Sequence, residues 1–149
     1  MQGADGFFKI FSRSIRQILK KADLDFEALQ EIRMRIDRPL MVRQGGEEYS
    51  LTEEGELVPC RKIQEAGEIS KIHYVNRCEL METMEYIAGY SLYAYEDELR
   101  QGFLTIQGGH RVGVAGKILM EEGKIKSIRY ISFLNIRLAH QIAGCADKV

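Results

Sequence analysis

The apolar residues near the start of the chain recur with the period of an α-helix. They stand three and four positions apart: Phe7, Phe8, Phe11, Ile15, Ile18 and Leu19. Cations occupy much of the remaining face: Arg13, Arg16, Lys20 and Lys21. This pattern predicts an amphipathic helix over 7–21, with its cations toward the C-terminus, where the helix dipole favours them. We expect its apolar face to pack in a core; the alternative is a basic helix that lies on a membrane surface.

From residue 23 the pattern predicts a short helix over 23–30 and strands after it. Three apolar residues alternate with polar ones, which is the period of a half-buried strand: Ile32, Met34 and Ile36. Pro39 marks the turn that follows, and a glycine pair marks the next turn. We therefore expect a partner strand over 40–43 and short strands over 47–63, with an acidic turn at 53–56.

Two helices are predicted in the middle of the chain. Asn76, followed three residues later by Glu79, forms the pattern of a capping box, and Gly89 marks the end of the helix that it opens. Ser91 is the expected cap of a second helix, which runs to about residue 101 and stops at the glycine that follows.

The last third of the chain has the pattern of strands. The segments FLTIQ and HRVGVAGKILM predict a hairpin whose two-residue turn is Gly108-Gly109, because glycine adopts the positive φ that such a turn requires. A second turn at 121–123 leads to another strand-like segment, 124–139. Together the elements predict an α+β fold in which helices pack on an antiparallel sheet. No linker-like segment is visible, so we expect one domain over 1–149; a subdivision into 1–60 and 61–149 stays open.

Composition narrows the class of protein. Hydrophobic residues make up 45% of the chain and charged residues 29%, which is typical of a globular protein. No apolar run reaches the ~20 residues of a membrane-spanning helix, and no signal-like segment opens the chain. The three cysteines are too far apart for a metal knuckle and indicate reduced thiols in a cytosolic protein: Cys60, Cys78 and Cys145.

Charge is distributed unevenly along the chain. Residues 1–45 and 102–149 carry net charges of +3 and +4, whereas residues 46–101 carry −8, and the whole chain carries −1. Such a distribution suits contacts with a partner. Its magnitude is too small to indicate nucleic-acid binding.

The motifs for independent chemistry are incomplete. A P-loop requires a glycine five residues before its Gly-Lys pair and Ser or Thr after it, but Gly116-Lys117 has Arg111 and Ile118 at those positions. The dinucleotide-binding pattern fails at the same arginine. The histidines are too scattered to predict a metal site: His73, His110 and His140. We therefore expect no catalytic residue, metal or cofactor in this chain alone.

Three arginines on strand-like segments remain as candidate binding residues: Arg111, Arg129 and Arg137. Taken one at a time, each is explained by a solvent-facing position on a strand. The functional alternative is recognition of an anion, because a guanidinium fork binds phosphate oxygens bidentately. Composition alone leaves the two interpretations open.

Three long segments resemble one protein family: LQEIRMRIDRPLMVR, YSLYAYEDELRQGFLTIQGGHRVGVAGK and IRYISFLNIRLAHQIAGCADKV. They are similar to the N-terminal region of stage III sporulation protein AA, and the likeness runs from about Leu29 to Val149. This family comprises ATPases of endospore-forming bacteria that are similar to the motor ATPases of type II and type IV secretion and pilus systems. In the family a P-loop ATPase domain follows the segment equivalent to GCADKV. The resemblance therefore implies that this chain is the region before the motor domain.

The resemblance also implies a fold and a set of site residues. In related secretion motors this region is a PAS-like antiparallel sheet with helices, and two of its arginines point at the bound nucleotide. The segment HRVG places Arg111 in the first role, SIRYI places Arg129 in the second, and Arg137 is a further candidate. ATP and Mg²⁺ belong to the full-length family, and we expect neither to bind tightly to this chain alone.

Function, partners and location follow from the resemblance as well. It implies a regulatory and oligomerisation domain of a motor that energises a channel from the mother cell to the forespore. Its expected partners are the motor domain of its own family, further copies of itself and other membrane proteins of the sporulation operon. Nucleic acid is not expected, and membrane contact would be peripheral at most, in the mother-cell cytoplasm beside the membrane around the forespore. The competing hypothesis is a stand-alone adaptor that uses its basic first helix on anionic lipid or nucleic acid.

Overall fold

The computed structural model describes residues 6–62, 71–91, 95–116, 119–121, 124–127 and 131–140. Its helices are α2 (Arg13–Lys21), α3 (Arg77–Gly89), α4 (Tyr95–Gln101) and the 3-10 turn η1 (Cys60–Lys62). Its strands are β1 (Leu29–Arg35), β2 (Met41–Gln44), β3 (Glu47–Leu51), β4 (Leu57–Pro59), β5 (Phe103–Thr105), β6 (Arg111–Gly116), β7 (Leu119–Glu121), β8 (Lys124–Ser127) and β9 (Ile131–Arg137).

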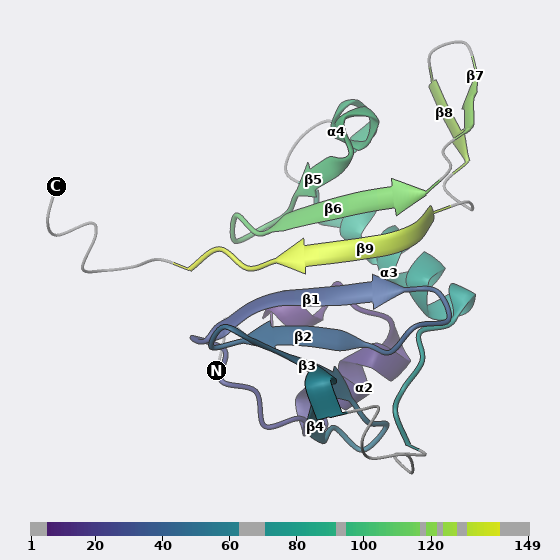
Figure 1. Ribbon diagram of the computed structural model, residues 1–149. Helices are drawn as coiled ribbons and strands as arrows, with labels where there is room; N and C mark the ends of the chain where they lie inside the picture. Colours follow the sequence, from purple (N-terminus) through teal and green to yellow (C-terminus); the bar gives the residue numbers. More distant parts are fainter. Residues whose placement is uncertain are drawn as a thin grey trace, which may run out of the picture.

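Seven strands form one sheet in the order β4-β3-β2-β1-β9-β6-β5, and its neighbouring strands are antiparallel. Figure 1 shows α2 and α3 behind this sheet, with the opposite face of the sheet toward the viewer. Strands β7 and β8 pair with each other in a separate two-stranded sheet, beyond the end of β6. The predicted α+β fold with helices on an antiparallel sheet is confirmed. Because β1 pairs with β9, strands from both sides of residue 60 share the sheet.

The core lies between the sheet and these two helices. Ile32 and Met34 of β1 pair with Ile136 and Leu134 of β9, and all four side chains are fully buried. The alternate residues of both strands point to the other face, because successive side chains of a strand point to opposite sides. Helix residues complete the core from behind: Ile15, Leu19, Leu80, Met84 and Ile87. The predicted alternation in β1 is therefore confirmed.

The helix predicted over 7–21 is interrupted at Ser12. Its hydroxyl accepts a hydrogen bond from the Ile15 N–H and so caps α2, while its own N–H donates to Thr83 Oγ1 of α3 at 2.9 Å. Because the Ser12 N–H donates to Thr83, it cannot donate to a carbonyl one turn earlier, as a continuous helix would require. The apolar residues before the break are buried: Phe7, Phe8, Ile10 and Phe11. The apolar face of this segment lies in the core, as expected, and not on a surface that a membrane could reach.

The helix predicted over 23–30 is wrong. Strand β1 already begins at Leu29, and the residues before it form a turn. The Asp25 carboxylate accepts a hydrogen bond from the Glu27 N–H, and the Asp25 carbonyl accepts one from the Ala28 N–H. An aspartate that binds nearby backbone groups in this way competes with helix formation.

The hairpins predicted between residues 31 and 63 are present. The partner strand expected over 40–43 is β2, one residue later in the chain. Gly45 and Gly46 join β2 to β3 with φ angles of +59° and +82°, which glycine adopts without strain. The acidic turn predicted at 53–56 separates β3 from β4.

The predicted capping box of α3 is confirmed. Asn76 Oδ1 accepts a hydrogen bond from the Glu79 N–H at 2.8 Å, and Glu79 Oε1 accepts one from the Asn76 N–H at 3.0 Å. The helix ends with Gly89, also as predicted. Ser91 is not the cap of α4, because it forms a β-bridge with Ile106, and α4 begins later.

The glycine turn between β5 and β6 is one residue longer than predicted. The Ile106 N–H donates to the His110 carbonyl at 3.0 Å, and the Gly109 N–H donates to the Ile106 carbonyl at 2.9 Å. The loop therefore contains three residues, Gln107, Gly108 and Gly109. Both glycines have a positive φ, +91° and +81°, so the predicted reason for glycine at these positions holds.

The segment after β6 is less regular than predicted. The second turn expected at 121–123 lies mostly outside the described residues, between β7 and β8. The strand-like segment 124–139 is divided into β8 and β9. Within the described ranges, none of the helices is both long enough and apolar enough to span a bilayer.

Candidate anion-binding face

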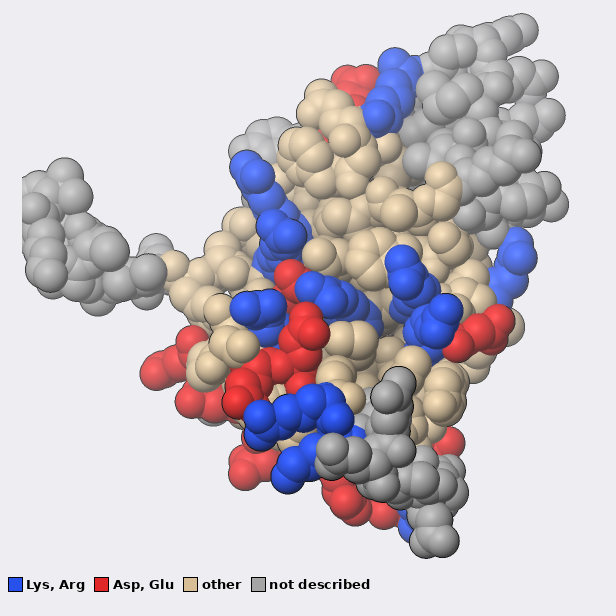
Figure 2. Space-filling model, viewed as in Figure 1, with Lys and Arg blue, Asp and Glu red and all other residues tan. Residues whose placement is uncertain are grey.

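The face of the sheet that points away from α2 and α3 is lined with arginines. Cross-strand pairing places Arg111 of β6 opposite Arg137 of β9, and Arg137 opposite Glu31 of β1. Arg33 and Arg35 take the next outward positions along β1, because they alternate with its buried core residues. Figure 2 shows Lys and Arg side chains over the middle of this face, with Asp and Glu mostly nearer its lower edge.

Arg111, the first predicted anion-binding residue, is exposed on β6. Its guanidinium carbon lies 5.4 Å from the centre of the Phe103 ring on β5, a cation–π distance. It forms no ion pair with any of the described residues. A guanidinium stacked on a ring keeps its in-plane N–H groups available, so Arg111 is placed to bind an oxyanion bidentately.

Arg137 shares a carboxylate with a neighbouring arginine. Its Nε lies 3.4 Å from Glu31 Oε1, and Arg33 Nε pairs with the other oxygen of Glu31. Glu31 is only 7% exposed, and two guanidinium groups compensate for the burial of its charge. The Arg137 side chain is 70% exposed, so this ion pair holds it weakly and leaves it accessible from solvent.

A second carboxylate balances the arginines nearer β3. Glu48 Oε2 lies 3.1 Å from an Arg33 terminal nitrogen and 3.8 Å from one of Arg43. Glu31 and Glu48 together therefore pair with Arg33, Arg43 and Arg137, whereas Arg111 has no such partner in the described part of the chain.

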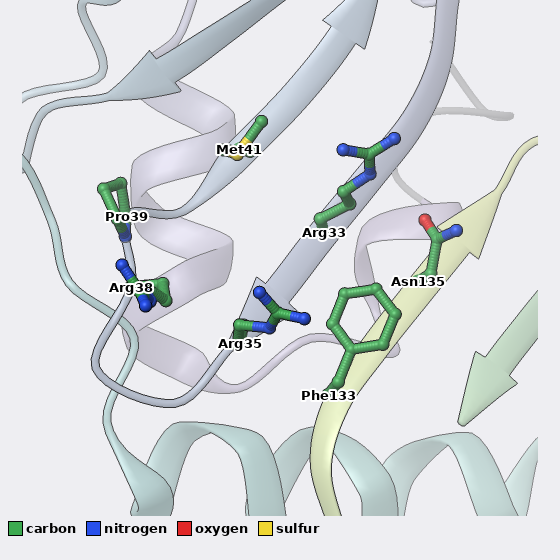
Figure 3. A pocket seen from close by; sticks show the side chains of 7 residues that line it. All are labelled: Arg33, Arg35, Arg38, Pro39, Met41, Phe133 and Asn135. Carbon is green, nitrogen blue, oxygen red and sulfur yellow. The ribbon is translucent and has the colours of Figure 1, made fainter. Parts of the chain in front are cut away.

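A hollow of about 530 Å³ opens on the same face, where β1, β2 and β9 meet the turn after β1 (Figure 3). Seven residues line it: Arg33, Arg35, Arg38, Pro39, Met41, Phe133 and Asn135. The Arg35 guanidinium carbon lies 5.4 Å from the centre of the Phe133 ring. Sequence reasoning missed Arg35 and Arg38, although Arg35 stands at an outward position of a strand whose alternation was recognised.

The structure brings together two of the three predicted arginines. Arg111 and Arg137 occupy paired positions on neighbouring strands. Arg129 lies outside the described residues, so its place near Arg111 stays a prediction. Gly108 and Gly109 form the loop that leads into the strand of Arg111.

His110 holds that loop against the end of β9. Its Nδ1 accepts a hydrogen bond from the Ala139 N–H at 2.9 Å, so the proton of the neutral ring is on Nε2. A Cβ atom on Gly108 would come within 2.8 Å of Nε2, which shows how closely the loop packs on the ring. Burial lowers the pKa of His110, and the charge of His140 lowers it further. The neutral ring thereby fixes the backbone just before Arg111.

The described residues contain no cluster of three His, Cys, Asp or Glu side chains close enough to hold a metal ion. Cys60 and Cys78 are free thiols, and Cys145 lies outside the described residues. What this part of the chain does present is a set of guanidinium groups on one uncovered sheet face, and such groups recognise oxyanions.

Comparison with known proteins places this fold in a family. The family model described as sporulation stage III, protein AA matches residues 1–149. The chain is 34% identical over 122 residues to stage III sporulation protein AA of Bacillus subtilis (strain 168), which covers 81% of this chain and 33% of that relative. It thus spans about a third of the length of the relative. No solved structure matches it significantly. The resemblance seen in three segments of the sequence is confirmed, and the chain belongs to the sporulation stage III, protein AA family.

Proposed function

We propose that this chain is the regulatory and assembly domain of a sporulation ATPase, and that Arg111 senses the nucleotide held by the motor domain. The family resemblance motivates the proposal, because a P-loop domain is expected to follow this region. The observation that carries it is the position of Arg111, exposed on the sheet face opposite α2 and α3 with no carboxylate partner among the described residues. A motor domain docked on this face would bring phosphate oxygens to a guanidinium that Phe103 already orients.

The three arginines have unequal expected roles. Arg111 would stabilise the charge on the transferred phosphoryl group, an effect of ~10³–10⁵-fold on turnover in enzymes with an arginine finger. Arg137 contributes less, because the nearby carboxylate of Glu31 compensates part of its charge. Arg129 keeps the role that the resemblance implies. The motor domain, and not this chain, would bind ATP and Mg²⁺.

The test is ATP turnover by the protein in which a P-loop domain follows this chain. We expect Arg111→Ala to lower kcat at least about tenfold with a smaller change in KM, because the interaction is strongest in the transition state. Arg111→Lys retains the positive charge but loses the guanidinium fork, so its kcat should lie between those of the unchanged protein and Arg111→Ala. Arg13→Ala is the matched control, since Arg13 is exposed on α2 behind the sheet. Unchanged kcat in Arg111→Ala refutes the sensing role.

Two simpler measurements bear on the same proposal. Sequencing the gene past the codon for Val149 should reveal an in-frame P-loop motif that ends in GKT or GKS. This chain by itself should neither hydrolyse ATP nor bind it tightly. A chain that hydrolyses ATP alone would overturn the proposal.

Assembly and location are part of the same proposal. The chain would contact further copies of itself and the other membrane proteins of the sporulation operon, from the mother-cell cytoplasm at the membrane around the forespore. A fluorescent fusion in sporulating cells tests the location. Cross-linking of the full protein, with and without ATP, tests whether assembly responds to nucleotide.

The adaptor hypothesis rests on four cations of the first helix: Arg13, Arg16, Lys20 and Lys21. The apolar face of the first helical segment is buried in the core, so only its cations remain for a lipid or nucleic-acid surface. One of them, Arg16, donates to the carbonyls of Lys9 and Phe11 and stacks on Tyr86. Salt-sensitive binding of the chain to anionic vesicles would restore this hypothesis.

A further inference from the structure

A second pair of guanidinium groups lies in the hollow of Figure 3. Arg35 ends β1 and lies beside Phe133, and Arg38 follows in the turn next to Pro39. We propose that this hollow binds an acidic segment of a partner protein, with carboxylate side chains on Arg35 and Arg38. The proposed function of Arg111 does not require this site, so the two proposals can fail separately.

The turn that carries Arg38 is held firmly in place. The Asp37 N–H donates to the Val75 carbonyl at 2.8 Å, the Val75 N–H donates to the Arg38 carbonyl at 2.9 Å, and the Leu40 N–H donates to the His73 carbonyl at 2.8 Å. Asp37 has a φ of +62°, a left-handed conformation that Asp adopts more readily than most residues with a Cβ. The hydrogen bonds on both sides of it indicate a preorganised turn, and preorganisation reduces the entropy lost on binding.

The charges of Arg35 and Arg38 are unbalanced. Glu31 and Glu48 pair with Arg33 on the same face, but the described residues give neither Arg35 nor Arg38 a carboxylate partner. Both side chains are exposed, so their forks are reachable from solvent. Stacking on the Phe133 ring fixes the plane of the Arg35 fork. The hollow is therefore positively charged before any ligand binds.

The lining favours an acidic peptide over a nucleotide. Sites for di- and triphosphates surround the phosphate oxygens with backbone N–H groups of a glycine-rich loop or a helix N-terminus. The residues that line the hollow include no glycine and no helix residue. Guanidinium forks alone suffice for carboxylates, and Met41, Pro39 and Phe133 offer an apolar wall to the neighbouring side chain of the peptide.

The test is a titration of the ¹⁵N-labelled chain followed by NMR. The probe is the peptide acetyl-LEEL-amide, and its uncharged match is acetyl-LQQL-amide. We expect shifts at residues around the hollow with the first peptide only, weakened by salt. Arg35→Gln and Arg38→Gln should each weaken binding by about tenfold, and Arg35→Lys by less, since it keeps the charge but loses the fork. Arg13→Gln, on α2 behind the sheet, is the matched control and should bind like the unchanged chain.

Parallel titrations with ATP and with inorganic phosphate decide the ligand class. If either shifts the same residues at a lower concentration than the acidic peptide, the hollow is a phosphate site and the proposal is wrong. Equal binding of both peptides, no binding at millimolar concentration, or full binding by Arg35→Gln and Arg38→Gln also overturns it. Both substituted side chains are exposed, so the melting temperatures of the variants should stay within about 2 °C of the unchanged chain, which verifies their folding.

Discussion

The carboxylate of Glu79 connects α3 to α2, and its removal should destabilise the fold measurably. It is 5% exposed and accepts hydrogen bonds from His73 Nε2 at 2.8 Å, from Ser14 Oγ at 2.5 Å and from the Asn76 N–H at 3.0 Å. Burial alone would raise the pKa of Glu79, but the bonds from His73, Ser14 and Asn76 outweigh it. Its pKa is therefore lowered below the ordinary 4.5.

Glu79→Gln keeps the shape of the side chain and removes its charge. The Ser14 hydroxyl can turn and accept from the new amide, so no group need lose its partner. The bonds from His73 and Asn76 lose the assistance of the charge, which is worth about 1 kcal/mol each. We therefore expect the free energy of unfolding at pH 7 to fall by about 2 kcal/mol, measured by urea denaturation.

The pH dependence tests the same reasoning independently. Because the folded pKa of Glu79 is lowered, its contribution is fully present above pH 4.5 and is lost as the pH falls through the folded pKa. The difference between the unchanged chain and Glu79→Gln should thus shrink below pH 4.5. Glu85→Gln, an exposed position on the same helix, should change stability by less than about 0.5 kcal/mol. A Glu79→Gln difference that is equally small at pH 7, or that persists at low pH, would refute the argument.

Two further predictions concern the loops. Because the pKa of His110 is lowered in the folded chain, protonation of this ring favours the unfolded chain as the pH falls below 6.5. The free energy of unfolding, measured with urea, should therefore decrease from pH 7.5 to 5.5. His110→Asn keeps a hydrogen-bond acceptor without the titrating ring and should show a smaller decrease. Gly45→Ala, with a φ of +59° and open space around it, should lose about 1 kcal/mol. Gly55→Ala should lose at least about 2 kcal/mol more, because its Cβ would meet backbone at the end of α2 at 2.7 Å. Equal melting temperatures for the two alanine variants, measured by calorimetry, would contradict the clash.

The parts of the fold that were predicted correctly depend on local signals. The capping box needs only Asn76 and Glu79, three residues apart, and the alternation of β1 is visible within one short segment. The two failed helix predictions have different causes. The break at Ser12 is set by a contact with Thr83, which is 71 residues away and outside any local window. The turn before β1 is set by a local signal that helical periodicity does not capture, because the Asp25 carboxylate accepts a hydrogen bond from the Glu27 N–H two residues later.

The arrangement of the candidate site also depends on contacts between distant parts of the chain. Arg111 and Arg137 were singled out, but only the pairing of β6 with β9 makes them neighbours. The charge of Arg33 is balanced because β1, β2 and β3 bring Glu31 and Glu48 to it. In the same strand, Arg35 is left unbalanced.

Whether an arginine of this sheet is a binding residue thus depends on the acids of the neighbouring strands. The outward positions of β1 hold Glu31, Arg33 and Arg35 in order, and the first two neutralise each other. Toward the β1–β2 turn no described acid pairs with an arginine, so positive charge accumulates in the hollow around Arg35 and Arg38. If that asymmetry directs binding, a carboxylate placed on β9 opposite Arg35, as in Phe133→Glu, should abolish peptide binding in the hollow. Arg111 should keep its effect on ATP turnover in the same variant. Placing the carboxylate at Ser132, an exposed position at the start of β9 outside the hollow, should leave both properties unchanged.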